Sequence, residues 1–188
     1  MPGEKVDFRL RALEFVQTPV ILWGSVGNDL TEGAARVMKI LIADDDATTR
    51  LIMEAFVTKW GHSPVVVADG GAAMMALRSK DAPPVAILDW MMPGLDGIEI
   101  CRRLREVQKN TYIILVTSRD DSASLVEGLE AGANDYIRKP FNQDELKARL
   151  LVGIRYAQVQ QTLELRLAEL ESAFREIHAL KARLDIPI

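Results

Sequence analysis

The sequence predicts an α/β fold in which a parallel sheet is covered by helices on both faces. Residues 85–88 form a short apolar run between Pro83-Pro84 and Pro93-Gly94, and such runs are typical of strands buried on both faces. From Lys39 to about residue 150, strand-like and helix-like segments alternate five times with short connections. This alternation favours a parallel sheet, and right-handed crossovers leave few topologies for it.

The five expected strands are short and apolar, and each is followed by polar or turn residues. They cover residues 39–43, 64–68, 85–88, 112–116 and 134–137. The segments between them have apolar residues at helical spacing, as Ile52, Ala55 and Phe56 show in the first, which stops at Gly61. The expected helices cover residues 47–60, 70–78, 95–107 and 122–131, and a last one begins near Asn142.

The last helix is expected to continue far beyond the domain. Residues 144–184 contain no proline and one glycine, Gly153, which need not break a helix. The apolar positions, at intervals of 3, 4, 4, 3, 4, 3 and 7, are Tyr156, Val159, Leu163, Leu167, Leu170, Phe174, Ile177 and Leu184. This pattern approximates a coiled-coil heptad repeat with one irregular step between Leu163 and Leu167. A helix of roughly 60 Å cannot bury such a seam by itself, so we expect a parallel homodimer.

The chain thus divides into three expected parts. Residues 1–37 are an N-terminal extension of unclear role, 38–150 are the α/β domain, and 151–188 are a coiled-coil helix that continues its last helix. Residues 8–15 have a helical pattern and 19–23 a strand pattern, but no motif for chemistry is present there. Two interpretations stay open, namely an extension dispensable for activity and a packing or partner segment that uses Ile21, Leu22 and Trp23.

Composition and charge exclude several classes of function. The chain of 188 residues is 48% hydrophobic, so it can bury a sizeable core, and its net charge of -4 argues against a nucleic-acid-binding surface. Residues 19–26 are too short to span a bilayer, and no signal peptide is recognisable. The single cysteine, Cys101, cannot form an internal disulfide. We therefore expect a cytoplasmic protein that has neither nucleic acid nor a membrane as partner.

Polar residues that can bind a ligand or take part in a reaction follow four of the five strands. Asp44 and Asp45 follow the first, Asp89 the third, Thr117 the fourth and Lys139 the fifth. The carboxyl ends of parallel strands lie at one edge of a sheet, where α/β folds bind ligands. Three carboxylates at one place need a cation, and an all-oxygen set suits Mg²⁺. No His/Cys cluster competes for the metal, because the two histidines are isolated in the sequence.

A carboxylate beside Mg²⁺ can act as a nucleophile toward phosphorus and form an acyl phosphate. The developing charge on the phosphoryl group then needs the metal, a lysine and a hydroxyl, and Lys139 and Thr117 provide the last two. The chain has no G-x-x-x-x-G-K-[ST] loop, which argues against a nucleotide-binding kinase or ATPase. The phosphoryl donor is therefore expected to be another molecule.

These motifs resemble those of a two-component response regulator receiver domain. The resemblance covers residues 38–150 and depends on ILIADDD at 40–46, LDWMMPGLDG at 88–97, VTS at 116–118 and GANDYIRKPF at 132–141. It implies a flavodoxin-like (βα)5 fold with sheet order 2-1-3-4-5. It also implies that Asp89 receives its phosphoryl group from a sensor histidine kinase, a phosphotransfer protein or a small phosphodonor.

The resemblance further implies a role for each metal-site residue. Asp89 is the phosphoacceptor, Asp45 binds Mg²⁺ directly, and Asp44 acts largely through water. The main-chain carbonyl of Met91 is the third protein ligand of the metal. Met91 and Trp90 are bulky neighbours of the site, so the lifetime of the phosphoryl group stays open.

Two further pairs of residues have roles in the family. Thr117 and Lys139 contact the phosphoryl group, and the Lys139–Pro140 peptide bond is usually cis. Thr117 and Tyr136 form the switch that responds to phosphorylation. Such a domain is a regulatory module with slow autodephosphorylation, and it signals here through the C-terminal helix to a downstream effector domain, which we do not recognise in this chain.

Two other classes of function are weighed against this one. A haloacid-dehalogenase-type phosphatase also combines Asp, Mg²⁺, Thr and Lys, but it needs Asp-x-Asp-x-Thr, and the stretch that begins at Asp89 lacks the second aspartate. A constitutive coiled-coil dimer with an inert domain is the other alternative. It competes poorly, because every expected site residue is present.

Overall fold

The computed structural model describes residues 37–107, 110–118 and 122–183. The helical and strand patterns expected within residues 8–15 and 19–23 lie outside the described residues. None of the helices in the described part of the chain is both long and apolar enough to cross a membrane.

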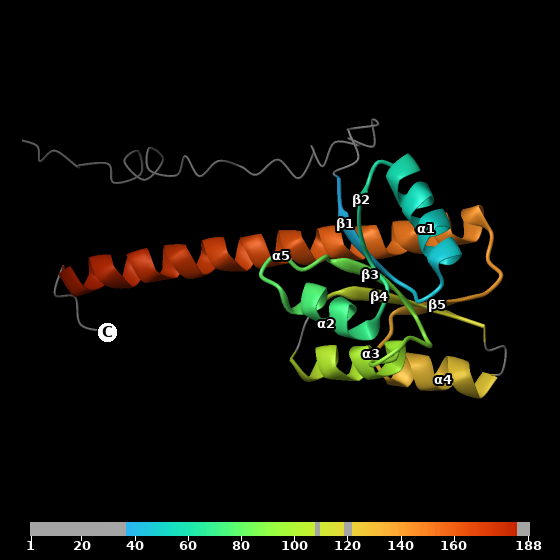
Figure 1. Cartoon of the computed structure of the whole chain (residues 1–188). Coiled ribbons are helices and arrows are strands. Elements are labelled where there is room, and N and C mark those ends of the chain that lie inside the picture. Colours follow the sequence, from blue (N-terminus) through green and yellow to red (C-terminus); the bar gives the residue numbers. More distant parts are fainter. Residues whose placement is uncertain (1–36, 108–109, 119–121, 184–188) are drawn as a thin grey trace, which may run out of the picture. The chain divides into compact units, whose positions relative to one another are not determined.

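Five parallel strands form one sheet, as the sequence predicts (Figure 1). The strands are β1 (Lys39–Ala43), β2 (Ser63–Val67), β3 (Val85–Asp89), β4 (Tyr112–Thr117) and β5 (Asp135–Arg138). Their order is β2-β1-β3-β4-β5, which confirms the flavodoxin-like topology. The central strands β3 and β4 are buried along their whole length, in agreement with their uninterrupted apolar sequences.

The helices cover both faces of the sheet and enclose two apolar clusters. They are α1 (Ala47–Lys59), α2 (Gly70–Arg78), α3 (Gly97–Glu106), α4 (Ser122–Glu130) and α5 (Gln143–Arg183). On one face, residues of α1 and α5 pack with β-strand side chains such as Ile40 and Ile114. On the other face, α2 and α3 pack over Leu88 and Leu115, and α4 lies on the same side (Figure 1).

Aspartates in the loops after β1, β2 and β3 cap three of the helices. The side chains of Asp46, Asp69 and Asp96 accept hydrogen bonds from the backbone N–H groups of residues 49, 72 and 99, at 2.8, 2.8 and 2.7 Å. Each bond satisfies a backbone donor that the first helical turn leaves without a partner. The caps therefore fix where these helices begin at the edge of the sheet.

The first half of α5 packs on the sheet. Leu146, Leu150, Ile154 and Ala157 are buried on this face, at helical spacing. Among the strands, α5 contacts mainly β4 and β3. Ile137 of β5 belongs to the same apolar cluster, and an ion pair also joins α5 to β5, because Arg149 Nη1 lies 2.7 Å from Asp135 Oδ1.

Gly153 does not interrupt α5, and the fold gives a reason for glycine there. A Cβ at this position would lie 2.6 Å from Cδ1 of Tyr112 on β4. Glycine therefore lets the helix approach the sheet, and the Tyr112 ring also contacts the ring of Tyr156 one turn later, at 5.4 Å between centroids.

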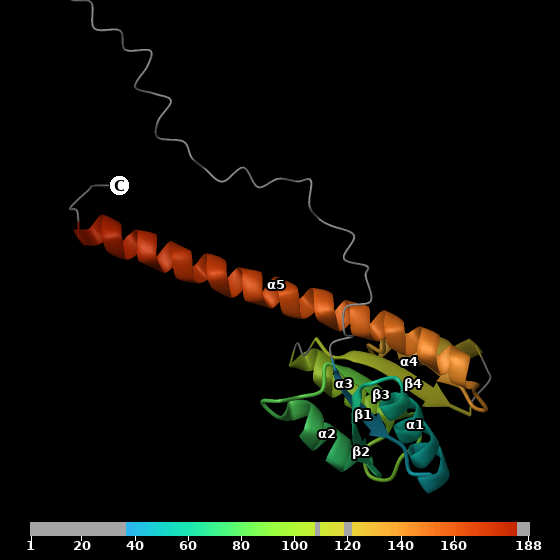
Figure 2. The same cartoon turned by 90° about the horizontal axis from the view of Figure 1, so that it is seen from above.

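The second half of α5 leaves the sheet (Figure 2). Ala157, Gln160, Gln161 and Glu164 border a cavity of about 240 Å³ with the α2–β3 loop. All residues from Thr162 to Lys181 are exposed. One half of the long helix thus belongs to the core. The apolar side chains of the other half are not covered by any of the described residues.

Candidate functional site

Three carboxylates meet at the carboxyl edge of the sheet. Asp44 and Asp45 directly follow β1, Asp89 is the last residue of β3, and β1 pairs with β3. One carboxylate oxygen of each residue lies within 4.8 Å of those of the other two. Asp44 and Asp89 are buried, whereas Asp45 is exposed. The donor set is all oxygen and partly open to water, and this combination fits Mg²⁺.

Lys139 forms ion pairs with two carboxylates of this cluster. Its Nζ lies 2.8 Å from Asp44 Oδ2 and 3.1 Å from Asp89 Oδ1. The residue follows β5, and the Lys139–Pro140 peptide bond is cis, as the resemblance implies. Burial acts to lower the pKa of Lys139, but its hydrogen bond to Asp44 and the charge of Asp89 outweigh burial and raise that pKa. Lys139 is therefore held in its charged form.

Asp89 is in an environment that makes its negative charge costly. Burial raises the pKa of the Asp89 carboxyl, Lys139 opposes the rise, and the charges of Asp44 and Asp45 add to it. One lysine beside three carboxylates leaves negative charge uncompensated. A divalent cation among them would relieve this repulsion, and the residues present therefore fit a metal ion.

The third aspartate of the run has a different task. Asp46 caps α1, and hydrogen bonds from Thr49 lower the pKa of its carboxyl. Its backbone N–H donates to Asp44 Oδ1 at 2.9 Å, while Arg50 Nη1 donates to the main-chain oxygen of Asp44 at 2.6 Å. Asp44 is thus held from both its side chain and its backbone. The contact of Arg50 with Asp44 was not predicted, because nothing in the sequence shows that this helical side chain extends to the end of β1.

Thr117 and Tyr136 lie on adjacent strands near the cluster. Thr117 ends β4 and is buried, and its main-chain oxygen accepts a hydrogen bond from Lys139 N at 2.7 Å. Tyr136 is opposite Leu115 in the β4–β5 register, two residues before Thr117, and it packs partly buried against the cluster under α2 and α3. Thr117 and Tyr136 therefore lie on two paired strands, two residues apart in their register.

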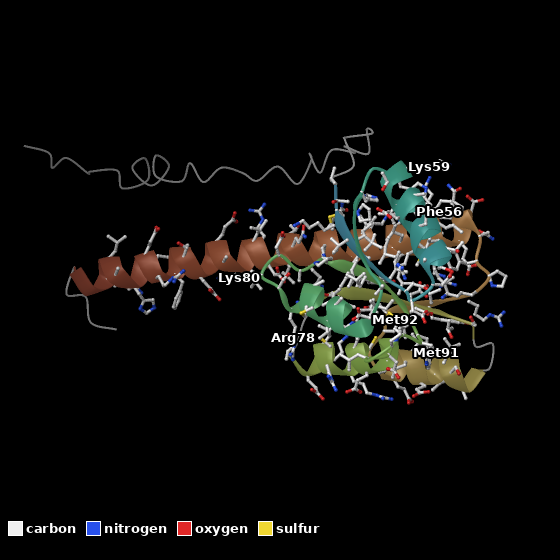
Figure 3. The ribbon with its side chains drawn as sticks, viewed as in Figure 1. Phe56, Lys59, Arg78, Lys80, Met91 and Met92 are labelled. Atoms are coloured by element: carbon white, nitrogen blue, oxygen red, sulfur yellow. The ribbon has the colours of Figure 1, made fainter. Side chains whose placement is uncertain are left out.

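The loop after Asp89 separates two side chains that we expected to flank the site. Trp90 is 5% exposed, and its ring lies against α4, where a Cβ at Gly128 would be 3.2 Å from Trp90 Cζ3. Met91 is 62% exposed, whereas Met92 is buried (Figure 3). Gly97 lets the loop close, because a Cβ there would lie 2.5 Å from the main-chain oxygen of Asp89. Only Met91 is therefore an exposed bulky neighbour.

Comparison with known proteins shows which family has this fold and this set of residues. The family model of the response regulator receiver domain matches residues 40–151. The chain belongs to this family. Receivers are regulatory modules of two-component systems, they are phosphorylated by histidine kinases, and they generally use Mg²⁺.

Curated relatives of this receiver include the response regulator MprA. The chain is 39% identical to the *Mycobacterium avium* protein over 127 residues, which cover 68% of the chain and 55% of that protein. The *Mycobacterium tuberculosis* protein is 34% identical over 154 residues, or 79% of the chain and 66% of that protein. The matches therefore span about half to two thirds of the length of these relatives.

Solved structures show the same domain. The receiver domain of *Francisella* response regulator 1452 is 35% identical, with a TM-score of 0.60 over 63% of this chain and 97% of that one. The BeF3-activated DrrB receiver domain is 32% identical, with a TM-score of 0.57 over 63% of this chain and 98% of that one. Both solved chains are receiver domains, and each match leaves more than a third of this chain uncovered.

A cavity beside the receiver site was not predicted from the sequence. A cavity of about 390 Å³ lies beside Lys139 and is bordered by Thr49, Ile52, Ser118, Lys139, Pro140 and Phe141. Its residues come from α1 and from the loops after β4 and β5. No pattern in the sequence joins these three segments, and only the sheet order brings them together.

Proposed function

We propose that this receiver is switched by phosphorylation of Asp89. The observation that carries the proposal is the position of Asp89, whose Oδ1 lies 3.1 Å from Lys139 Nζ within a cluster of three carboxylates. In the proposed step, a carboxylate oxygen of Asp89 forms a bond to phosphorus as the bond from phosphorus to the donor breaks. The donor is the phosphohistidine of a sensor histidine kinase or phosphotransfer protein, whose imidazole leaves and takes up a proton, or a small phosphodonor.

The proposed Mg²⁺ ligands are Asp45, Asp89 and the main-chain carbonyl of Met91, with Asp44 acting through water. The metal, when bound, supplies positive charge that offsets the repulsion between the carboxylates and the incoming phosphoryl group. Asp44 is suited to an indirect role, because its two oxygens already accept hydrogen bonds from Lys139 and from the Asp46 N–H. Asp45 is exposed and so remains open to a cation from solvent.

Lys139 and Thr117 are proposed to bind the phosphoryl oxygens. Lys139 already lies between Asp44 and Asp89, and Thr117 ends the strand that pairs with β3. Movement of the Thr117 hydroxyl toward the new oxygens would free space that Tyr136 can fill. The pair therefore forms the proposed switch, and autodephosphorylation is expected to be slow.

The proposed output passes through α5. We divide the chain into an extension at 1–37, the receiver at 38–150 and a coiled-coil helix at 151–188 that pairs with a second copy of the chain. An effector domain outside this sequence is the proposed recipient of the signal. The cytoplasm stays the predicted location, and neither nucleic acid nor a membrane is a predicted partner. The phosphatase alternative gains no support, since the matching family is a regulatory one.

The test is phosphoryl uptake from acetyl phosphate with and without Mg²⁺, followed by mass spectrometry. The wild type should gain one phosphoryl group only when Mg²⁺ is present, and Asp89→Asn should gain none, because asparagine keeps the shape but is not a nucleophile. Asp69→Asn is the matched control, since Asp69 is an exposed helix cap outside the cluster and asparagine also caps helices. Stoichiometric labelling of Asp89→Asn would refute the assignment.

A phosphoryl mimic gives a second test. A DrrB receiver domain has been solved in a BeF3-activated form. BeF3⁻ with Mg²⁺ should therefore change the amide spectrum of this chain around Asp89 and Thr117, and Asp89→Asn should show no such change.

A further inference from the structure

The exposed half of α5 carries a regular apolar seam. Its members are Leu163, Leu167, Leu170, Phe174 and Ile177, which are 51%, 51%, 67%, 64% and 52% exposed. They follow one another at intervals of 4, 3, 4 and 3 residues. This is the strict alternation of core positions in a coiled coil, with Leu167 and Phe174 at a and the other three at d. With this assignment the step from Leu163 to Leu167 is regular, and the irregular step expected there from the sequence lies instead between Val159 and Leu163, where α5 leaves the sheet.

We propose that this seam pairs with the same seam of a second copy of the chain, parallel and in register. The inference deepens the proposed function by defining how the two copies are joined. It does not depend on phosphorylation of Asp89.

Net charge favours another protein helix as the occupant over an anionic surface. Between residues 163 and 181 there are three basic and four acidic side chains. A helix that binds a membrane surface or nucleic acid is usually rich in lysine and arginine, and this one is not. Lys181 occupies the next a position, and a single lysine at a is a feature that fixes register and oligomer state in coiled coils.

The charges beside the seam favour a parallel pair. Arg166 occupies a g position and Glu171 the following e position. In a parallel, in-register dimer, each g residue faces the next e residue of the other helix, so Arg166 faces Glu171 twice. Arg166 Nη1 now lies 2.9 Å from Glu169 Oε2 in the same helix, but both side chains are largely exposed. Such an exposed pair is weak, and Arg166 can exchange it for Glu171.

The same charges disfavour an antiparallel pair. In that arrangement the e positions of the two helices face each other. The two antiparallel registers that keep the apolar layers matched place Glu171 opposite either Glu171 or Glu164 of the second copy. Both registers therefore bring carboxylates together, whereas the parallel register brings opposite charges together.

Disulfide formation in the full-length chain tests the orientation. Ile177→Cys should give a covalent dimer under mild oxidation, because residue 177 faces its own copy only in the parallel register. In the antiparallel registers it faces residue 167 or 160, which are more than two turns away along the helix. Glu176→Cys, on the outer side of the helix, is the control and should stay uncoupled. The native Cys101 is buried and does not interfere.

Charge reversal tests the register. Arg166→Glu and Glu171→Arg should each weaken the dimer by about tenfold, because each replaces two attractive pairs by two repulsive ones. The double variant should regain the dimer affinity of the wild type. Glu176→Arg, which lies outside the seam, is the control and should have the same dimer affinity as the wild type. Sedimentation of all four variants measures these affinities.

The results that overturn the proposal are distinct from those that overturn phosphorylation. A wild-type chain that is monomeric at tens of micromolar, or a dimer in which Ile177→Cys fails to couple, refutes the parallel seam. Ile177→Cys should form the same disulfide with and without Asp89→Asn, since the seam does not include the phosphoacceptor.

Discussion

At the residue scale, Lys139 is the side chain that limits the negative charge of the site. It is bonded to Asp44 and lies beside Asp89, so it competes with any metal for the same oxygens. Lys139→Met should therefore bind Mg²⁺ about tenfold more tightly by calorimetry, because one positive charge is removed from the cluster. The apo variant should also be about 2 kcal/mol less stable, since two buried carboxylates lose their partner.

The control for this prediction is Lys80→Met, because Lys80 is exposed and lies by the α2–β3 loop, away from the carboxylates. It should leave Mg²⁺ affinity unchanged. Weaker Mg²⁺ binding by Lys139→Met would show that the lysine positions the carboxylates for the metal rather than competing with it.

Cys101 is a residue whose chemistry is suppressed by packing. It is fully buried in α3, and burial raises the pKa of its thiol to about 12. Because the thiolate is the reactive form, the native chain should not react with a disulfide reagent at pH 8, and it should react with one equivalent after denaturation. Rapid reaction of the native chain would indicate that α3 opens on the time scale of the assay.

Single residues also show where sequence reasoning stops. The logic of parallel strands predicted that Asp44, Asp45 and Asp89 meet with Lys139, because it needs only the ends of strands. It could not predict that Arg50 holds the backbone of Asp44, since this contact depends on how far a helical side chain reaches.

At the element scale, α5 depends on the close approach of Gly153 to Tyr112. Gly153→Ala adds a methyl group that would lie 2.6 Å from the tyrosine ring. Alanine favours the helix by about 1 kcal/mol, but overpacking costs about 1–3 kcal/mol. We expect a net loss of stability in urea denaturation, and Gly153→Ala combined with Tyr112→Leu should recover part of it. A simple gain of stability in Gly153→Ala would mean that the helix shifts freely on the sheet.

The α4 helix and β5 are the elements expected to respond to phosphorylation. Thr117→Ala should still accept a phosphoryl group at Asp89, because the nucleophile and the carboxylates are intact. It should show less than about half of the wild-type change in amide shifts along α4 and β5, since the hydroxyl that binds the new oxygens is missing. Equal changes in both proteins would remove Thr117 from the switch.

Element boundaries were predictable to within about two residues, and the deviations have local causes. The third helix was expected at 95–107 and is observed at Gly97–Glu106, because Asp96 is its N-cap and the helix therefore begins two residues later than the apolar pattern suggests. The face of the sheet that α5 covers was less predictable, since the apolar spacing of Leu146, Leu150 and Ile154 gives a buried face but not its neighbour. Which strands lie under that face comes from the structure, where α5 packs mainly on β4 and β3.

At the scale of the whole molecule, one continuous helix joins the core of the receiver to the seam. Its buried half packs mainly on β3 and β4, and its exposed half begins at Thr162, within three turns of Gly153. A parallel pair would place two receivers at the same end of the two helices. A change around Tyr136 could then tilt α5 through the ion pair between Arg149 and Asp135 without separating the copies.

This arrangement predicts that phosphorylation changes helix geometry more than dimer affinity. Burial of only three large apolar side chains, at about 2 kcal/mol each, outweighs the coupling free energies of about 1–3 kcal/mol that are typical of switches. Leu170→Asp with Phe174→Asp should therefore be monomeric in sedimentation and still take up a phosphoryl group at Asp89. The wild type should remain dimeric with and without BeF3⁻. A dimer that forms only in the presence of BeF3⁻ would instead place the main interface on the receiver, because the seam itself is already exposed in α5.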